Sequence, residues 1–590
     1  MWVLILICTL WVGIAPTLTW PQFTGGNENI VVQTALEMRR DAGPVVVPSM
    51  MGEPRVRKPP LVAWITAASM DSNTITALSN DATREEAYVK LSWQVRWTGL
   101  LAGCVTVMAA FVLGRAIGGA VGGKFGGTMD VTMGGAAGDL VGNTVGRADN
   151  GAAVGLATAM VVCSNLLFLK YTRQSTSDVH LAMWVTIANA CFAVALLRNR
   201  ARLGPTVGPT VCATLGATLI PTFGALAVAM AFLCKGPVAL VQTVLPAMTF
   251  YLIFCRGAPN KMSVKKRAGM VLIGITIFAV IALPWFVHVY RTVPGVWQIW
   301  FSEVTREGAT ELGRDSPLAY LVLIPLLFPW LAFMIVGCIA IVQNKTDRAP
   351  WLAVMQVVVP LCVMVWAGDR KERYLLPFAA PAAVVCALGL VTWLRNWRRP
   401  MRTDKVVLWA HVLMLVGGGV ALGVAGTTQL TFDGHAWWGP AFATWVGVAF
   451  VALVALGLLL HRRLVWAIPA TTVLVMLGLG VIFMHGYRQG RSGMSELKPL
   501  ADVIRRTLPN AEVFDWTPGR SRVDEELAIY LNRTIHAADP MTLAPASVPR
   551  VIILCQTRDA PAPTLAPPWR VLAKVPERKN WWWAFELPAK

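Results

Sequence analysis

Charged residues are scarce in this chain: they make up 14% of its 590 residues, whereas hydrophobic residues make up 55%. Soluble globular domains carry about 25% charged residues. This composition therefore does not provide the water-exposed surface of a soluble enzyme of this length. A mean hydropathy of +0.56 points in the same direction. The chain is expected to have the lipid bilayer as its main solvent.

Other scarcities exclude further classes of protein. Of the 11 cysteines, only Cys555 lies away from the apolar stretches, so a disulfide framework is not expected. The seven histidines are scattered without metal-ligand spacing, so neither a metal site nor another cofactor is expected. The glycine-rich segment 118–155 lacks the Gly-Lys-Ser/Thr of a phosphate loop, and we interpret it as a connecting loop without chemistry of its own.

Long apolar runs are what the sequence has in abundance. A membrane-spanning helix needs about 20 apolar residues, and runs of this length are too long for barrel strands. The first run lacks a charged n-region and a clear cleavage site, so we interpret it as an uncleaved helix. The sequence thus predicts an α-helical polytopic membrane protein with about thirteen spans, near residues 2–20, 93–115, 153–170, 178–197, 208–233, 237–255, 268–290, 317–342, 350–367, 374–394, 406–425, 440–460 and 464–485.

The net charge of +20 follows membrane topology rather than nucleic-acid binding, because Lys and Arg crowd alternate loops. The positive-inside rule places those loops in the cytoplasm. With thirteen helices, the N-terminus is then cytoplasmic, and the first long loop and the C-terminal tail lie outside. No nucleic-acid partner is expected. The loop cations are Arg198, Arg200, Arg202, Arg256, Lys261, Lys265, Lys266, Arg267, Arg395, Arg398, Arg399, Arg402, Lys405, Arg462 and Arg463.

The chain divides into a transmembrane domain, residues 1–486, and a tail, residues 487–590. The first outer loop of the membrane domain, residues 21–92, is rich in side chains that carry chemistry. In the tail, predicted helices alternate with short apolar runs typical of strands, which indicates a small α/β domain. The predicted tail elements are helices 495–507 and 523–532 and strands 511–516, 550–555, 569–575 and 581–587.

Cations also occur in the predicted outer loops, although the positive-inside rule predicts few Lys and Arg residues there. Prolines stiffen the backbone around one such group, which favours a preorganised clamp for phosphate. The alternative is that these side chains snorkel to lipid headgroups. Several separate loops contribute, so a shared anionic ligand is the more specific interpretation. The candidate ligand-binding residues are Arg55, Arg57, Lys58, Lys235, Arg370, Arg373 and Tyr374.

Carboxylates on the same side are candidates for general-base chemistry. Glu28, next to Asn27, follows the first apolar run, and Asp178 begins the fourth. A carboxylate beside a cationic site can take the proton of an acceptor hydroxyl. The other interpretation of Asp178 is a helix N-cap, since Ser, Thr and Asp suit that position and its positive dipole end.

Seven segments, in order, resemble the motifs of one family, the bacterial aminoarabinose transferase (ArnT) and protein O-mannosyltransferase type of membrane glycosyltransferase. The resemblance implies the GT-C fold along most of the membrane domain. Its most specific part is Gly52-Glu53-Pro54 followed by Lys58-Pro59-Pro60-Leu61. The other segments are Asn27–Met38, in which Glu28, Ala35, Glu37 and Met38 match Asp-Glu-x-Arg-Tyr-Ala-Glu, then Arg173–Asp178, Lys235–Pro237, Leu283–Phe286, Phe328–Trp330 and Arg373–Pro377.

The resemblance implies a sugar donor linked to undecaprenyl phosphate, a polyprenyl phosphate, in the cell inner membrane. It also implies an acceptor that enters from the periplasm and inversion at the anomeric carbon. Lys58 and the cations near Arg373 would hold the lipid phosphate, whose developing charge they stabilise. Lipid A, protein hydroxyls and envelope glycans all remain open as acceptors, and the sugar is open as well.

Two departures from the family motif bear on catalysis. The Asp of the first outer loop is Asn27 here, and the Glu before Lys-Pro-Pro is Arg57. The amide of Asn27 cannot accept the acceptor's proton, so the general base would have to be Glu28 or Asp178. A non-catalytic relative that binds or transports a lipid-linked sugar is the alternative. No internal inverted repeat typical of transporters is found.

Overall fold

The protein is described by a computed structural model. It describes residues 1–590 except 24–25, 41–44, 122–149, 198–210, 256–263, 305–327, 367–371, 398–399, 425–430, 433–434, 437–439, 462–463, 465, 490–494, 517–524, 544, 558, 566, 578–579 and 590. The predicted glycine-rich loop lies largely outside the described residues, and so does Arg370.

Each predicted apolar stretch is mostly helical where the structure describes it, with short non-helical breaks such as Ser164–Asn165 and Phe328–Trp330. Among the described residues, seven helices are long and apolar enough to cross a membrane, and six shorter apolar helices occupy the remaining stretches. The number of actual spans stays a prediction. The helices are α1 Trp2–Ile14, α5 Arg84–Ala120, α7 Asn150–Cys163, α8 Leu166–Tyr171, α9 Ser177–Leu197, α10 Val211–Lys235, α11 Val238–Phe250, α12 Val264–Thr292, α13 Val296–Val304, α15 Leu331–Gln343, α16 Ala349–Trp366, α17 Ala379–Asn396, α18 Arg402–Val424, α19 Pro440–His461 and α20 Ala467–Gln489.

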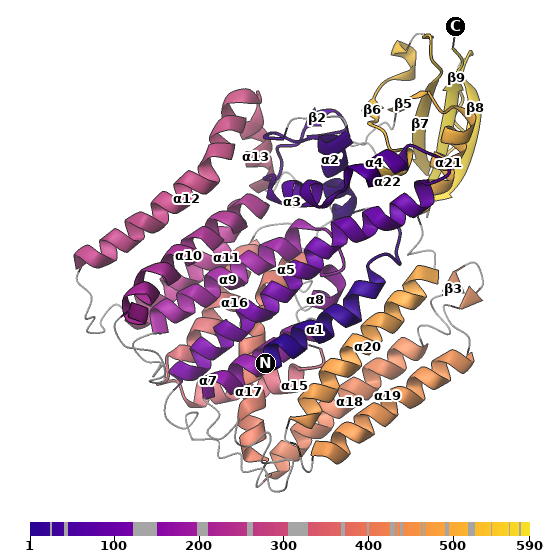
Figure 1. The fold of residues 1–590 in the computed structure, drawn as a ribbon. Helices are drawn as coiled ribbons and strands as arrows, with labels where there is room; N and C mark the ends of the chain where they lie inside the picture. The colour runs from indigo at the N-terminus through magenta and orange to yellow at the C-terminus, as the bar shows by residue number, and fades with distance from the viewer. Residues whose placement is uncertain are drawn as a thin grey trace.

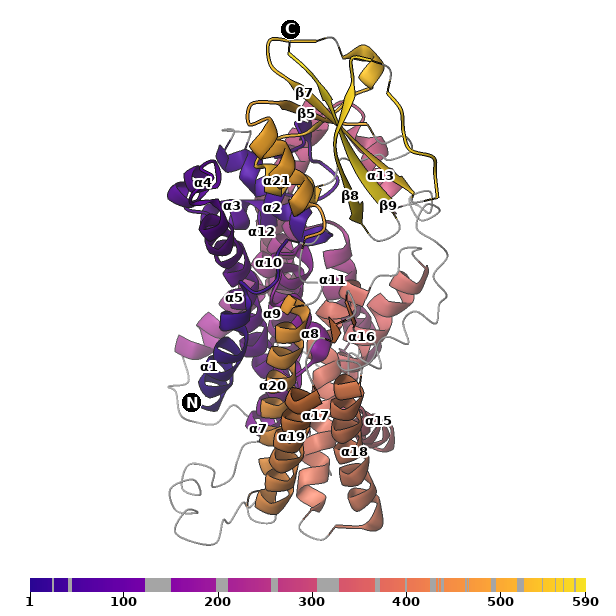
Figure 2. The same ribbon diagram turned by 90° about the vertical axis from the view of Figure 1, so that its right-hand side faces the viewer.

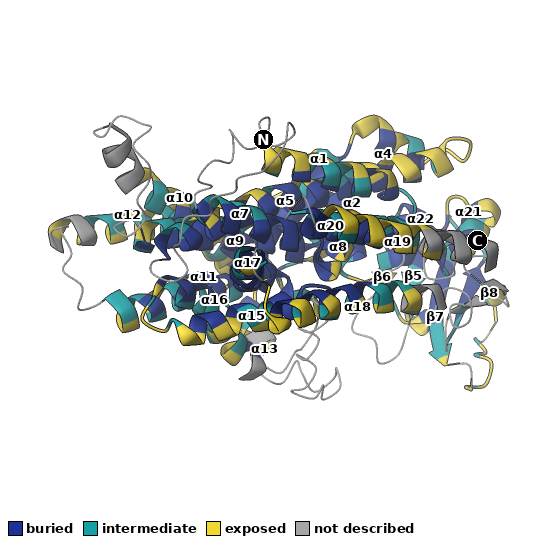
Figure 3. Ribbon diagram, turned by 90° about the horizontal axis from the view of Figure 1, so that it is seen from below, coloured by how far each residue is buried: buried dark blue, intermediate teal, exposed yellow. Residues whose placement is uncertain are grey.

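The helices run side by side in an elongated bundle, with the C-terminal sheet at one end (Figures 1 and 2). α5 packs against α7 and α9, and α17 packs against α7 and α15. α17 is buried along most of its length, and buried residues gather at the centre of the bundle (Figure 3). Short segments complete the helical part: η1 Ala15–Thr17, η3 Tyr251–Cys255 and η6 Glu372–Phe378.

Residues 21–83 fold into what we call the cap segment, which lies between the bundle and the C-terminal sheet (Figure 1). Because α5 already begins at Arg84, this region is shorter than the loop of residues 21–92 expected from the sequence. Helical structure fills most of it. Its elements are α2 Asn27–Arg40, the hairpin strands β1 Ser49–Met50 and β2 Glu53–Pro54, α3 Leu61–Ser69 and α4 Ser72–Leu78.

The tail forms a five-stranded mixed sheet of order β6-β5-β7-β9-β8 with two helices. β5 pairs in parallel with β6 and β7, and β9 pairs antiparallel with β7 and β8. Every predicted helix and strand of the tail is present, and β6 is an additional strand. The elements are α21 Lys498–Thr507, β5 Glu512–Asp515, α22 Glu525–Leu531, β6 His536–Ala537, η9 Pro540–Thr542, β7 Arg550–Thr557, β8 Arg570–Glu577 and β9 Asn580–Leu587, while β3 Thr431–Phe432 and β4 His435–Ala436 form a separate hairpin.

The tail and the cap segment share one hydrophobic core, which also includes the start of α5. Tyr88 of α5 and Tyr530 of α22 meet there with ring centroids 5.1 Å apart. The Tyr88 hydroxyl donates to the Tyr530 carbonyl at 2.9 Å, and the Tyr530 hydroxyl accepts from the Phe23 backbone N–H at 2.8 Å. The tail is therefore fixed to the segment that carries Asn27 and Glu28.

Candidate active site

Asp178 lies at the start of α9 and is 1% exposed. Its Oδ1 accepts a charged hydrogen bond from Lys235, and its Oδ2 lies 3.6 Å from Arg373 Nε. Oδ2 itself has no hydrogen-bond donor among the described residues. A buried carboxylate oxygen without a donor is costly unless something else, such as a ligand hydroxyl, completes its hydrogen bonding.

Lys235 is the last residue of α10, where the chain turns out of the helix. Gly236 takes a positive φ of 72°, which glycine adopts without strain, and Pro237 follows it. Lys235 Nζ lies 3.8 Å from the centroid of the Tyr374 ring, and Arg373 Cζ lies 5.3 Å from the same ring. Tyr374 thus places an aromatic face against two cations, an arrangement that stabilises positive charge.

Asn27 begins α2 and contacts Arg373 of η6. With the amide oriented to suit its partners, its oxygen accepts from Arg373 Nε at 2.9 Å and from Nη2 at 3.1 Å. An amide oxygen orients the guanidinium but does not neutralise it. The carboxylate that faces Arg373 is therefore Asp178, whose Oδ2 lies 3.6 Å from Arg373 Nε.

Lys58 lies between the prolines of the cap segment and is half-buried. Burial, followed by the charge of Lys235, lowers its pKa from 10.5 to about 7. Arg55 and Arg373 act in the same direction, whereas Asp178 opposes them. Hence the structure brings together Lys58, Asp178, Lys235 and Arg373, which we call the charged cluster.

Glu28, the other candidate base, lies beside the charged cluster but is occupied by different partners. Arg96 of α5 donates to its carboxylate through Nε at 2.9 Å and through Nη2 at 2.8 Å, and the Ser175 backbone N–H donates at 3.0 Å. Both side chains are almost fully buried. This geometry ties α2, α5 and the start of α9 together.

The other sequence candidates take different places. Arg55 acts electrostatically on Lys58, Arg57 is exposed, and Arg370 lies outside the described residues. Sequence reasoning missed Arg96 and Glu372. Arg96 is a charged residue within the long α5, which is itself a signal of a role. Glu372 accepts from Lys170 and, at 3.0 Å, from the Tyr171 hydroxyl, so the residue before Arg373 is anchored to α8.

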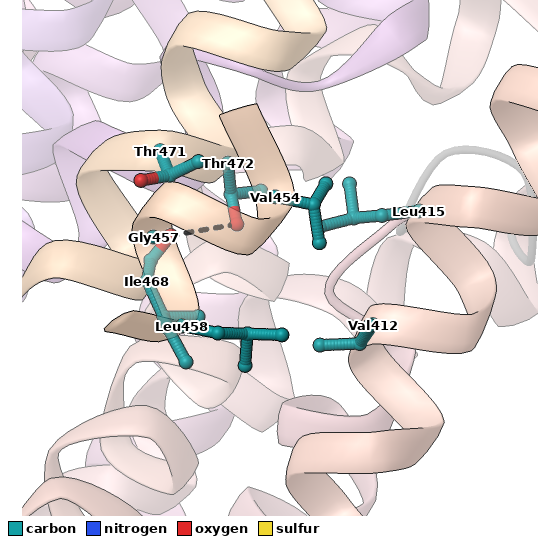
Figure 4. A pocket seen from close by; sticks show the side chains of 8 residues that line it. All are labelled: Val412, Leu415, Val454, Gly457, Leu458, Ile468, Thr471 and Thr472. Carbon is teal, nitrogen blue, oxygen red and sulfur yellow. Dashed lines mark hydrogen bonds between the residues drawn. The ribbon is translucent and has the colours of Figure 1, made fainter. Parts of the chain in front are cut away.

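No group of three His, Cys, Asp or Glu side chains that could hold a metal ion occurs among the described residues. A pocket of about 220 Å³ lies elsewhere, between α18, α19 and α20 (Figure 4). Its lining is apolar except for two threonines, of which Thr472 bonds His411 at 2.9 Å. This pocket carries no charged side chain, so the charged cluster is the better candidate for chemistry on an anionic substrate.

The fold and the charged cluster together define a polytopic helical membrane protein with a buried, mainly cationic site beneath a cap segment and a small α/β domain. No protein-family model matches the chain. Several curated proteins that the chain matches carry the name undecaprenyl phosphate-alpha-4-amino-4-deoxy-L-arabinose arabinosyl transferase. The chain is 25% identical over 278 residues to one from Proteus mirabilis, with 46% of each chain covered, and 24% identical over 396 residues to one from Pseudomonas fluorescens, with 64% of each covered.

The match thus spans about half to just under two thirds of the length of these relatives. The crystal structure of ArnT from Cupriavidus metallidurans bound to undecaprenyl phosphate superposes with a TM-score of 0.70, covering 99% of this chain and 98% of that chain at 17% identity. The chain therefore shares the fold of this ArnT structure, the GT-C fold that its sequence motifs predict, and is similar in sequence to the curated transferases.

Proposed function

We propose that this protein is an integral membrane glycosyltransferase that moves a sugar from a polyprenyl phosphate, such as undecaprenyl phosphate, to an acceptor hydroxyl. The observation that carries the proposal is the charged cluster itself. Three cations from three separate segments converge on one buried carboxylate whose Oδ2 has no donor among the described residues. The names of the curated relatives, which specify a sugar carried on undecaprenyl phosphate, support the same donor class.

In the proposed reaction the acceptor oxygen attacks the anomeric carbon from the side opposite the phosphate. The bond between that carbon and the phosphate oxygen breaks, and its electron pair stays on the phosphate, so the anomeric configuration inverts. The charge that develops on the leaving phosphate is stabilised by Lys58, Lys235 and Arg373, held in place before the reaction starts. The acceptor proton passes to Asp178 Oδ2.

The choice between the two carboxylates follows from their partners. Glu28 accepts three hydrogen bonds from Arg96 and Ser175, so its oxygens are already engaged. Asp178 has one oxygen without a hydrogen bond. We therefore assign the base role to Asp178 and a positioning role to Glu28, and Asn27 orients Arg373 without carrying a proton.

The proposed setting is the cell inner membrane, with the N-terminus cytoplasmic and residues 487–590 as a periplasmic domain. Residues 1–486 then form the transferase domain, and its cap segment faces the periplasm beside the tail. The acceptor is an envelope component that presents a hydroxyl there: lipid A, a protein or a glycan. Arg55, Arg57, Arg370 and Tyr374 are proposed to support the phosphate site.

The direct test uses the purified protein in lipid, radiolabelled polyprenyl-phosphate sugars and a total envelope extract as the acceptor. Removing the base should slow transfer by about 10²- to 10⁴-fold, so we expect Asp178→Asn to lose activity to this extent. Lys58→Ala should weaken binding of the carrier phosphate. The control is Lys90→Ala, because the Lys90 side chain is 60% exposed and pairs with Glu86 on the surface of α5.

If the wild type transfers sugar and Asp178→Asn does so equally well, the assignment of the base is wrong. If the carrier binds through Lys58 but no sugar moves to any acceptor, the protein is a non-catalytic relative that binds a lipid-linked sugar. If the carrier does not bind, the phosphate role of the charged cluster is wrong as well.

A further inference from the structure

We infer that the Arg173 guanidinium is a second anion-binding site, which takes a phosphate group such as that of a phospholipid head group. This site is separate from the charged cluster and does not depend on the proposed transfer reaction. Its basis is a buried positive charge whose Nη2 has no hydrogen-bond acceptor among the residues that the structure describes.

Arg173 lies in the short connection between α8 and α9 and is 4% exposed. Its Nε donates to Thr17 Oγ1 at 3.0 Å, and its Nη1 donates to the Leu169 carbonyl near the end of α8. Both acceptors are neutral oxygens. They orient the guanidinium without balancing its charge, and they leave Nη2 unsatisfied.

A comparison with Arg96 shows what Arg173 lacks. Arg96 is buried to a similar extent, and its guanidinium donates to both carboxylate oxygens of Glu28. Burial lowers the pKa of Arg173 to about 10, so this side chain is still charged at neutral pH. Buried charges in proteins are normally paired, because an unpaired one is costly to remove from water. A bound anion would supply the missing negative charge.

A glycine of α20 lies directly beside Nη2. α20 packs against η1 and α8, the two segments whose oxygens hold Arg173. A Cβ added at Gly480 would lie 3.2 Å from Nη2, and Gly480 is partly exposed. An acceptor oxygen lies about 2.7–3.2 Å from the nitrogen that donates to it. Because α20 carries no side chain at this position, such an oxygen can approach Nη2 there.

The chemistry of the site favours a phosphate group. Arginine binds phosphate oxygens through charge-assisted hydrogen bonds, and its planar guanidinium suits this geometry. Arg173 also lies at the same end of α9 as Asp178, on the side predicted to face the periplasm, where phospholipid head groups are within reach. A phospholipid and free phosphate offer the same group, and the experiment separates these two sources.

The experiment uses full-length, delipidated protein in detergent and measures both ligand binding and the melting temperature. The probes are radiolabelled dioleoylphosphatidylglycerol, inorganic phosphate and, as a lipid without phosphate, dioleoylglycerol. We expect phosphatidylglycerol to bind the wild type and to raise its melting temperature, because a ligand that binds only the folded state stabilises it. Arg173→Gln should lower this affinity at least about tenfold, since the charge-assisted hydrogen bonds are lost. Lys58→Ala should retain the binding, because Lys58 belongs to the charged cluster.

A second variant probes the same site and keeps the arginine. The methyl group of Gly480→Ala would occupy the side from which the acceptor oxygen approaches Nη2, so this variant should weaken the binding of phosphatidylglycerol. Gly478→Ala is the matched control, because it lies on the same helix and its added Cβ meets no atom within 4 Å. This arm remains informative if Arg173→Gln fails to fold.

Weaker binding in Arg173→Gln and Gly480→Ala, but not in Gly478→Ala or Lys58→Ala, supports the site. The same pattern with inorganic phosphate also supports it and assigns free phosphate as the source. Equal binding by the wild type and Arg173→Gln, equal stabilisation by dioleoylglycerol, or loss of binding in Lys58→Ala alone overturns the inference. None of these outcomes depends on sugar transfer, so the proposed function is tested separately.

Discussion

We expect binding of the carrier phosphate to be coupled to protonation of the Lys58 amine. Its pKa of about 7 lies below the ordinary value of 10.5, so at pH 8 most free protein has a neutral Lys58. A bound phosphate favours the charged amine and raises that pKa, so binding takes up a proton at pH values between about 7 and the higher pKa of the bound form. The affinity for a polyprenyl phosphate should accordingly fall as the pH rises through this range.

Calorimetry at pH 8 in two buffers of different ionisation enthalpy measures this uptake, and we expect about one proton per bound carrier. Lys58→Arg is the matched variant, because a guanidinium stays charged at this pH and should bind with almost no uptake. Uptake that is the same in both proteins would assign the titrating group to another residue.

The Glu28–Arg96 pair makes a different kind of prediction, one about stability. Removing one partner of a buried ion pair leaves an uncompensated charge, so Glu28→Gln should destabilise the protein by about 3–5 kcal/mol. Thermal unfolding in detergent measures this loss. In Glu28→Gln/Arg96→Met neither charge remains, and we expect part of the stability to return; a double variant less stable than both single variants would contradict the pairing.

The sequence largely predicted which residues gather in the charged cluster, but not how these and neighbouring residues pair. Motif positions predict Asn27, Lys58, Asp178, Lys235 and Arg373 as neighbours, and the structure brings them together. The partner of Glu28, by contrast, lies 68 positions away in an apolar helix. Contacts between residues so far apart in the sequence depend on how the helices pack, and this packing cannot be read from a single sequence.

At the scale of elements, glycines set the spacing of α15 and α17. A Cβ added at Gly389 would lie 2.0 Å from the Phe333 carbonyl oxygen, and one at Gly337 would lie 2.1 Å from the Val385 carbonyl oxygen. These two helices therefore touch through their backbones, and no side chain can be accommodated without moving one helix.

Gly389→Ala is expected to lower stability by about 1–3 kcal/mol or more, because overpacking forces the backbone to shift. Gly478→Ala is the matched control: it lies within α20, where an added Cβ meets no atom within 4 Å. The control should be neutral or slightly stabilising, since alanine favours the helix. Comparable melting temperatures for the two variants would show that the close contact does not constrain the helices.

Elements were more predictable in the tail than in the cap segment. Runs of apolar residues predict strands β7, β8 and β9 within a few residues. In β7 and β9 successive residues are buried, so both faces of these strands are covered, since neighbouring residues in a strand point to opposite faces. The two-residue strand β6 is too short to leave such a pattern. The helices α2, α3 and α4 lie in a region interpreted from the sequence as a loop, because their burial depends on the tail and the bundle.

For the whole molecule, the contacts form a path from the tail to the charged cluster. Tyr530 of the tail accepts from the Phe23 backbone N–H, and the Phe23 ring lies 5.0 Å from Arg96 Cζ. Arg96 holds Glu28, and Glu28 holds Ser175, three residues before Asp178. The tail thus helps to fix α2 and the start of α9 without contributing a charged group to the cluster.

Tyr530→Ala tests this dependence. Truncating a large buried aromatic side chain typically costs about 3–5 kcal/mol, so we expect a lower melting temperature. Carrier binding should weaken as well, because the position of the cap segment relative to the charged cluster depends on this contact. Tyr530→Phe should have a smaller effect, since it keeps the ring beside Tyr88 and loses only the hydroxyl that meets Phe23. Met541→Ala, 85% exposed on the same tail, is the control. If Tyr530→Ala melts earlier yet binds the carrier as tightly as the wild type at a temperature where it is folded, the tail stabilises the protein without shaping the site.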